Sequence, residues 1–118
     1  MRNFIVLPAV LCLLAPCYGE THDGTYILDC FQQVDLIDDG RPVTLDGNQK
    51  VGFIHGLVEG ISKTGNGRYF ILPVEWTLGE SESLVRRYLN DHPDELSQES
   101  AALVFEALKN GYPIKNKP

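Results

Sequence analysis

Three glycines interrupt a stretch that otherwise has the pattern of a helix, and they constrain the fold more than any other feature. In VGFIHGLVEG, residues 51–60, they occupy positions 52, 56 and 60, among apolar residues at helical spacing. Each interior glycine costs a helix roughly 1 kcal/mol relative to alanine. A stripe of small residues permits close contact, so we expect Gly52, Gly56 and Gly60 to face another helix. Replacing Gly56 with leucine would then destabilise the fold by about 1–3 kcal/mol through overpacking.

Glycines at this spacing also occur at the dimer faces of transmembrane helices. A membrane span needs roughly 20 apolar residues, and four ionisable side chains interrupt this stretch. They are Lys50, His55, Glu59 and Lys63. The sequence therefore favours a packed helix in a globular domain.

The N-terminus has the three-part layout of a secretory signal peptide. Arg2 precedes the apolar run at residues 4–14, and the small-residue segment APCYG follows. We predict cleavage after Gly19, which leaves one small domain of residues 20–118 with a modest core. An alternative is a lipoprotein acylated at Cys17, but Pro16 is a poor fit to the small residue normally found at that position.

The chain is acidic, with a formal net charge of −6 that becomes −7 when Arg2 is removed with the leader. This charge argues against a partner that is a nucleic acid or an anionic membrane surface. Two interpretations stay open. The acidity serves solubility, or it steers the protein toward a basic partner.

Cys30 is the only cysteine that remains after the predicted cleavage, so an internal disulfide is impossible. It lies within an apolar stripe that predicts a first helix ending near Gly40 and Pro42. The charges beside it are acidic, whereas a nucleophilic thiol needs an electropositive, exposed setting. We therefore expect Cys30 to be a buried and unreactive thiol.

Local start signals place the next two helices. Thr44 is a suitable N-cap for the glycine-containing helix, which we expect at about residues 45–63. Thr77 and Glu80 have the spacing of a capping box. The helix that begins there ends before Pro93, because proline disfavours a helical conformation in the preceding residue.

A fourth helix follows a cap at Asp94 or Ser97 and ends at Gly111. Within the third helix, Glu82 and Arg86 have the spacing of an exposed ion pair. We therefore predict an all-α fold, a small four-helix domain with one long loop between its second and third helices.

No motif in the sequence points to catalysis, a metal or a cofactor. His22, His55 and His92 are too scattered for a recognisable zinc pattern. No phosphate-binding glycine loop or nucleophilic serine turn is present. We predict a protein that is not an enzyme and binds no cofactor, in which His55 and His92 have structural roles.

Five short motifs follow one another along nearly all of the mature chain. They are G-F-I-x-G at 52–56, F-I-L-P at 70–73, T-L-G-E at 77–80, Y-L-N-D-H-P-D at 88–94 and A-L-x-x-x-Y-P at 107–113. Their order and spacing resemble the type VI secretion amidase immunity family, the Rap/Tai immunity proteins. The resemblance implies a helical periplasmic domain, often a homodimer. It also implies that this domain blocks the active-site groove of a papain-like peptidoglycan amidase.

The sequence departs from the family pattern at three cysteine positions, which here are Lys50, Ile71 and Ile114. Only Cys30 looks like a retained family cysteine. If each missing disulfide supplies about 2–4 kcal/mol, apolar packing must replace that stabilisation.

Two loops are candidates for contact with a toxin, because loops present polar groups on a rigid scaffold. The candidate residues are Asn66, Arg68 and Tyr69 in the long loop, and Asp91, His92, Asp94 and Glu95 in the turn after the third helix. The acidic turn would pair with a protonated catalytic histidine or a basic rim. Tyr69 or Trp76 would supply an aromatic anchor. Alternatively, Trp76 packs beneath the helix that begins at Thr77.

A second class of function also stays open, namely a periplasmic acid-stress or chaperone-like binding protein without a toxin partner. Small size, acidity and helical content suggest it. Such a protein should loosen below about pH 4, as its carboxylates are protonated, whereas an immunity protein binds one partner tightly near neutral pH.

Overall fold

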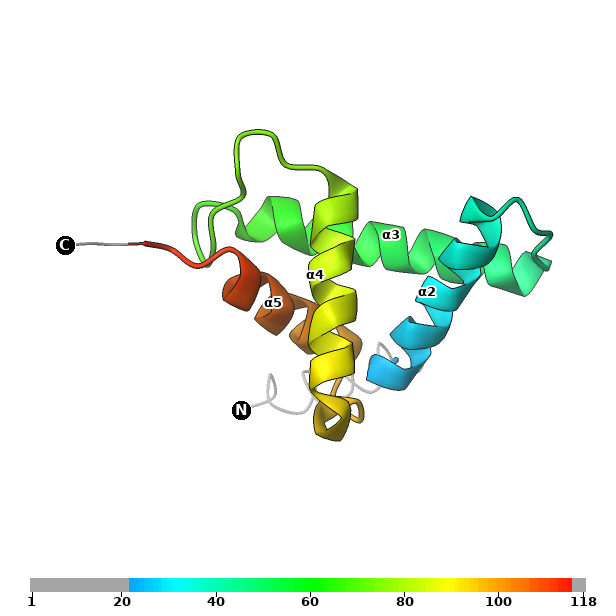
Figure 1. Ribbon diagram of the computed structural model, residues 1–118. Coiled ribbons are helices and arrows are strands. Elements are labelled where there is room, and N and C mark those ends of the chain that lie inside the picture. The colour runs from blue at the N-terminus through cyan, green and yellow to red at the C-terminus, as the bar shows by residue number, and fades with distance from the viewer. Residues whose placement is uncertain (1–21, 116–118) are drawn as a thin grey trace, which may run out of the picture.

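The protein is an all-α domain, as the sequence predicts. The computed structural model describes residues 22–115 and places four α-helices and one short 3-10 turn in that range, with no β-strand (Figure 1). The predicted signal peptide, with its alternative lipidation at Cys17, lies outside the described residues. The elements are α2 (Gly24–Asp38), α3 (Leu45–Gly65), α4 (Leu78–Asp91), η1 (Pro93–Glu95) and α5 (Ser100–Gly111).

Side-chain caps begin two of these helices where the sequence predicts them. The hydroxyl of Thr44 accepts a hydrogen bond of 3.0 Å from the amide of Gly47 at the start of α3. The hydroxyl of Thr77 accepts one of 3.3 Å from the amide of Glu80 at the start of α4. Both bonds satisfy donors that the first turn of a helix leaves free.

The start of α5 differs from its prediction, because neither Asp94 nor Ser97 caps it. Its N-cap is Glu99, whose side chain makes no capping hydrogen bond. Instead, the amide of Ser100 donates to the carbonyl oxygen of His22 at 2.8 Å, and the amide of Gly24 donates to the carbonyl oxygen of Leu96 at 2.8 Å. The first turn of α5 is therefore held by the segment that leads into α2.

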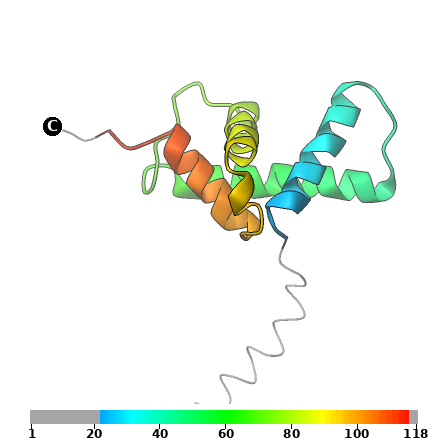
Figure 2. The same cartoon turned by 60° about the horizontal axis from the view of Figure 1, so that its bottom comes forward.

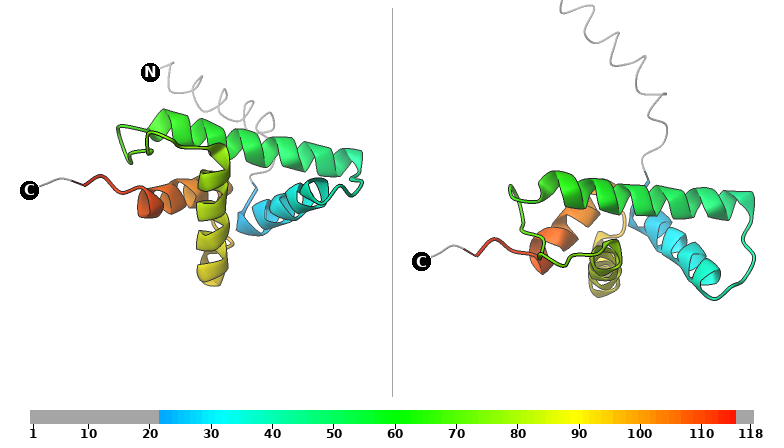
Figure 3. Two further views of the ribbon diagram at one scale, coloured as in Figure 1. Left: turned by 45° about the horizontal axis from the view of Figure 1, so that its top comes forward. Right: turned by 90° about the horizontal axis from the view of Figure 1, so that it is seen from above.

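The long helix α3 organises the fold, and it packs against α2, α4 and α5. These three helices lie on the same side of α3 (Figure 3). α4 and α5 pack together over its C-terminal half, and α2 lies beside its N-terminal half (Figure 2). The buried apolar core comes from all four helices and the long loop: Ile27, Cys30, Phe31, Val34, Ile54, Val58, Phe70, Val85, Leu89, Leu103, Val104, Ala107 and Leu108.

The prediction that the three glycines face another helix is wrong. Gly52, Gly56 and Gly60 are exposed, and a Cβ atom added at any of them would meet nothing outside its own helix backbone within 4 Å. α3 instead buries the opposite side, with Ile54 and Val58 fully enclosed. A leucine at position 56 would therefore enter open space and would not overpack the domain.

The predicted ion pair between Glu82 and Arg86 is also wrong. Glu82 is only 8% exposed, and its carboxylate is paired with Nδ1 of His55 on α3. Arg86 extends to α2, where its Nη2 atom donates to the carboxylate of Asp35 at 2.6 Å and to the carbonyl oxygen of Phe31 at 3.3 Å. Both side chains thus join α4 to neighbouring helices, and His55 has the structural role expected of it.

Cys30 is a buried free thiol, as predicted. Burial, with the carboxylate of Asp29 as a smaller contribution, raises the pKa of the Cys30 thiol to about 11.

An ordinary thiol has a pKa near 8.5. At pH 8 the thiolate fraction of native Cys30, and with it the alkylation rate, should therefore be about two hundredfold lower than that of an ordinary thiol. We expect this difference between native and urea-unfolded protein, measured as the rate of reaction with a thiol reagent. Equal rates, or a dimer that a reducing agent separates, would contradict burial of Cys30 in solution.

Candidate partner-binding surface

The loop between α3 and α4 is tightly held at its base. Phe70 is fully buried, and its ring lies so close to Gly65 that an added Cβ there would be 2.6 Å from Cζ. Gly67 has a φ of +86°, and its amide donates to the carbonyl oxygen of Phe70 at 2.8 Å. The side-chain oxygen of Asn66 accepts a 2.8 Å hydrogen bond from the amide of Leu72. Asn66 therefore stabilises the loop, and the exposed tip consists of the residues that follow it.

Tyr69 at this tip meets the Phe105 side chain of α5, and a cation lies beside each of the two rings. The rings of Tyr69 and Phe105 contact edge to face, with centroids 5.2 Å apart. The guanidinium of Arg68 lies 5.5 Å from the Tyr69 ring centroid, and Nζ of Lys109 lies 5.3 Å from that of Phe105. Two cations thus flank a pair of aromatic rings, and Tyr69 remains 50% exposed.

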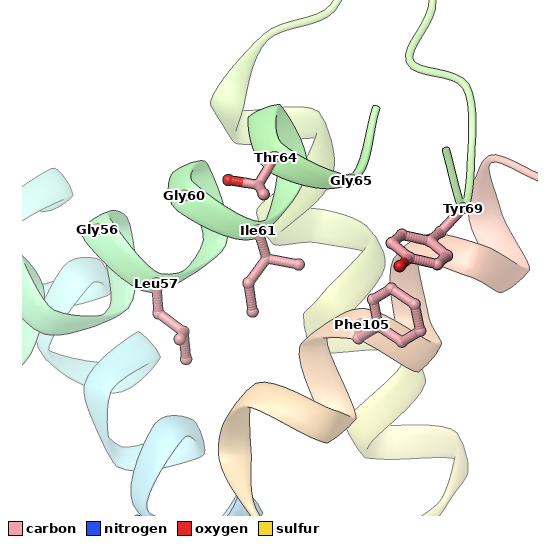
Figure 4. Close-up of a pocket in the computed structure, with 8 residues that line it drawn as sticks. All are labelled: Gly56, Leu57, Gly60, Ile61, Thr64, Gly65, Tyr69 and Phe105. Atoms are coloured by element: carbon pink, nitrogen blue, oxygen red, sulfur yellow. The ribbon is translucent and has the colours of Figure 1, made fainter. Parts of the chain in front are cut away.

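This aromatic pair borders an apolar groove of about 360 Å³. The other wall is the outer part of α3, where Gly56 and Gly60 provide space because they have no side chains (Figure 4). We call this hollow the α3 groove. Its lining residues are Gly56, Leu57, Gly60, Ile61, Thr64, Gly65, Tyr69 and Phe105.

A second hollow lies between the long loop and the segment after α5. The amide of Ile71 donates to the carbonyl oxygen of Tyr112 at 3.0 Å, which fixes the two segments side by side. The hollow has a volume of about 500 Å³ and includes Lys115 at its edge. Val74 is fully exposed nearby in the sequence, and Ile71 and Ile114 are each more than 40% exposed. This end of the molecule therefore presents apolar side chains to solvent.

The acidic turn after α4 contributes fewer free groups than the sequence suggests. Glu95 accepts a 2.7 Å hydrogen bond from the hydroxyl of Tyr88. The ring of His92 stacks on that of Tyr88 with centroids 3.9 Å apart, and its Nδ1 atom is 2.8 Å from the Tyr88 carbonyl oxygen. Burial, with the bond to Glu95, raises the pKa of Tyr88 to about 12. Asp91 and Asp94 remain exposed.

The structure does not bring the two predicted contact loops together. They lie at opposite ends of α4 (Figure 1), and a helix of this length separates its ends by about 20 Å. Arg68 and Tyr69 therefore belong to one surface, and Asp91 and Asp94 belong to another.

Trp76 packs within the fold, which was the alternative to an anchoring role. Its indole Nε1 donates to the hydroxyl of Ser81 at 2.7 Å, and the buried Ser62 of α3 donates to the same hydroxyl at 3.0 Å. This small polar network joins the first turn of α4 to α3. Tyr69 is the exposed aromatic candidate that remains.

Phe105 and Lys109 were not among the predicted contact residues, although they complete the aromatic row. Phe105 falls in the apolar stripe of the last helix and reads as a core residue. The structure leaves it only half-buried, in contact with Tyr69 on one side and lining the α3 groove.

Residues 22–115 contain neither a metal-ligand cluster nor a membrane-spanning helix. No group of three His, Cys, Asp or Glu side chains there is arranged to hold a metal ion. None of the helices in this range is both long enough and apolar enough to traverse a bilayer.

Comparison with models of protein families gives a match. A family model described as Rap1a immunity proteins matches residues 29–114. Searches of the curated proteins and of the solved structures found no match. The matched range begins within α2 and ends beyond α5, so it contains the α3 groove and the acidic turn.

Proposed function

The chain belongs to the Rap1a immunity protein family, and we propose from this premise that it neutralises a peptidoglycan amidase toxin in the periplasm. Membership in the family implies an immunity protein that binds a toxin protein. The amidase target, its delivery by type VI secretion and the periplasmic location are the further content of the proposal. The match over residues 29–114 is the observation that carries it.

Two properties of the chain support the periplasmic part of the proposal. Residues 1–19 have the layout of a secretory signal peptide, and peptidoglycan is found outside the cytoplasm. The buried, unactivated state of the only cysteine in residues 22–115 suits an oxidising compartment.

The proposed mechanism is physical blockage of the enzyme's active-site groove. Rigid elements suit this role, because a preformed surface loses little conformational entropy on binding. The long loop is anchored by Phe70 and Asn66, and the acidic turn is fixed through Tyr88. A homodimer, which the resemblance to the family also implies, is part of the proposal.

Co-expression with a toxin tests the proposal directly. We expect cells that send a peptidoglycan amidase to the periplasm to lyse, and the full-length chain to prevent lysis by the amidase encoded beside it. A chain without residues 2–19 is the matched control, and we expect it to give no protection because it would stay in the cytoplasm. Optical density reports lysis, and light scattering of the purified protein reports dimerisation.

Two outcomes would contradict separate parts of this proposal. Lysis that the full-length chain leaves unchanged would exclude the amidase as target. Protection by the leaderless chain would exclude action in the periplasm. Apolar dye binding that appears only below about pH 4, together with no protection, would favour the chaperone-like alternative.

A further inference from the structure

We propose that the α3 groove determines which toxin the protein binds. The groove receives an apolar side chain of the toxin that has carboxylates beside it. The inference rests on the proposed function, because it assigns the contact through which the toxin is bound. It is carried by the shape of the groove, by the charges at its rim and by the exposure of the glycines.

The shape of the groove depends on two missing side chains. Gly56 and Gly60 line it, and any Cβ at these positions would stand in open space. Each glycine costs α3 about 1 kcal/mol relative to alanine, and no contact within the described residues offsets that cost. The glycines therefore keep a hollow open on the outer part of α3, which is the condition for an apolar side chain to enter.

The charges at the rim define the chemistry of the occupant. Arg68 and Lys109 lie over the two rings of the aromatic wall. Among residues 22–115, Arg68 makes no ion pair, and the closest carboxylate oxygen to Lys109 is that of Glu106 at 3.8 Å. Two cations at the rim of an apolar hollow favour a partner whose apolar side chain is flanked by Asp or Glu. Because the chain as a whole has a net charge of −6, this local positive rim would orient the acidic part of the partner toward the groove.

A second copy of this chain is a poor occupant for the same groove. A two-fold symmetric contact places the same patch on both subunits. Arg68 and Lys109 of one copy would then approach the same cations of the other, which is unfavourable. The positive rim thus favours a different protein over self-association at this surface, and a homodimer would use another face.

A variant that fills the groove tests the proposal without disturbing the fold. Gly60→Leu places a side chain in the hollow and meets no atom at Cβ, and leucine is the better helix former. We expect it to keep or raise the thermal midpoint while weakening toxin binding at least about thirtyfold, the loss typical of a central contact. Arg68→Glu should also weaken binding. Calorimetry with the purified amidase measures both affinities.

Matched controls separate the groove from general effects of each substitution. Gly52→Leu makes the same change on the same helix, but Gly52 does not line the groove. Arg41→Glu makes the same charge change at an exposed arginine in the loop between α2 and α3. We expect both controls to bind the amidase with wild-type affinity.

Several results would overturn the inference. Wild-type affinity in Gly60→Leu, or equal weakening by Gly52→Leu, would exclude the groove. Loss of binding only when Asp91 and Asp94 are both changed to lysine would assign toxin binding to the acidic turn. A changed mass of isolated Gly60→Leu in light scattering would assign the groove to a second copy.

If wild type neither binds nor protects against the amidase, the proposed function fails as well. Protection by both wild type and Gly60→Leu would contradict the groove alone.

Discussion

Replacement of Phe70 with alanine is expected to lower the free energy of unfolding by about 3–5 kcal/mol, the usual cost of removing a fully buried aromatic ring. Phe70 has no exposed surface although it lies in a loop. Its ring fills the space beside Gly65 and contacts Phe105 with centroids 6.3 Å apart. Urea unfolding followed by circular dichroism measures the change.

The control for this variant is Val74→Ala in the same loop. Val74 is fully exposed, so its truncation should change the free energy of unfolding by less than about 0.5 kcal/mol. A loss below about 1 kcal/mol in Phe70→Ala would show that the loop does not depend on its buried ring. A large loss in both variants would point to an effect on the loop backbone.

Replacing Gly52, Gly56 and Gly60 together with alanine is expected to raise the free energy of unfolding by about 2–3 kcal/mol. All three are exposed helix-interior positions where a Cβ meets nothing within 4 Å. Alanine therefore gains helix propensity without steric cost. For a domain of this size, the thermal midpoint should rise by roughly 10–20 °C.

A fourth glycine of the same helix provides the control. Gly65→Ala places a methyl group 2.6 Å from the ring of Phe70, so we expect it to destabilise the protein. A triple variant with an unchanged or lower urea midpoint would show that the three outward glycines have internal contacts in solution. Equal stabilisation by Gly65→Ala would show that the ring of Phe70 does not pack closely against Gly65 in solution.

The helices were predictable because their boundaries depend on neighbouring residues. Thr44 and Thr77 bond to amides three residues away, and Pro93 restricts the residue before it. Both partners of such an interaction lie within a few residues of each other, so a short stretch of sequence is enough to recognise it. The start of α5 lacks this property, since its amide partner is the carbonyl group of His22, far away in the chain.

The direction of the glycines could have been predicted more closely. At about 100° per residue, Ile54 and Val58 lie roughly 160° around the helix from Gly52 and Gly56. A helix that buries its branched apolar residues must therefore turn these glycines outward. The spacing of four favours close packing of the glycines. The stripe of larger apolar residues on the opposite side is the stronger indication of which side of the helix is buried.

The candidate site could be predicted only in part. Arg68 and Tyr69 follow a glycine-rich turn, which suggested an exposed loop. The contact of Tyr69 with Phe105 joins positions more than 30 residues apart, and no local pattern contains that information. The prediction for Glu82 failed for a related reason: its partner is His55 on another helix and not Arg86 on its own helix.

The pair of backbone hydrogen bonds that joins the entry of α2 to the entry of α5 bears on the order of folding. Gly24 and Leu96 are 72 residues apart, and His22 and Ser100 are still farther apart. A chain that emerges in the direction of synthesis or translocation cannot close this clasp until its last helix begins to appear. Among the described helices, α2 therefore emerges first and is among the last to be fixed in place. The native contacts of α2 are thus complete only after the start of α5 is in place.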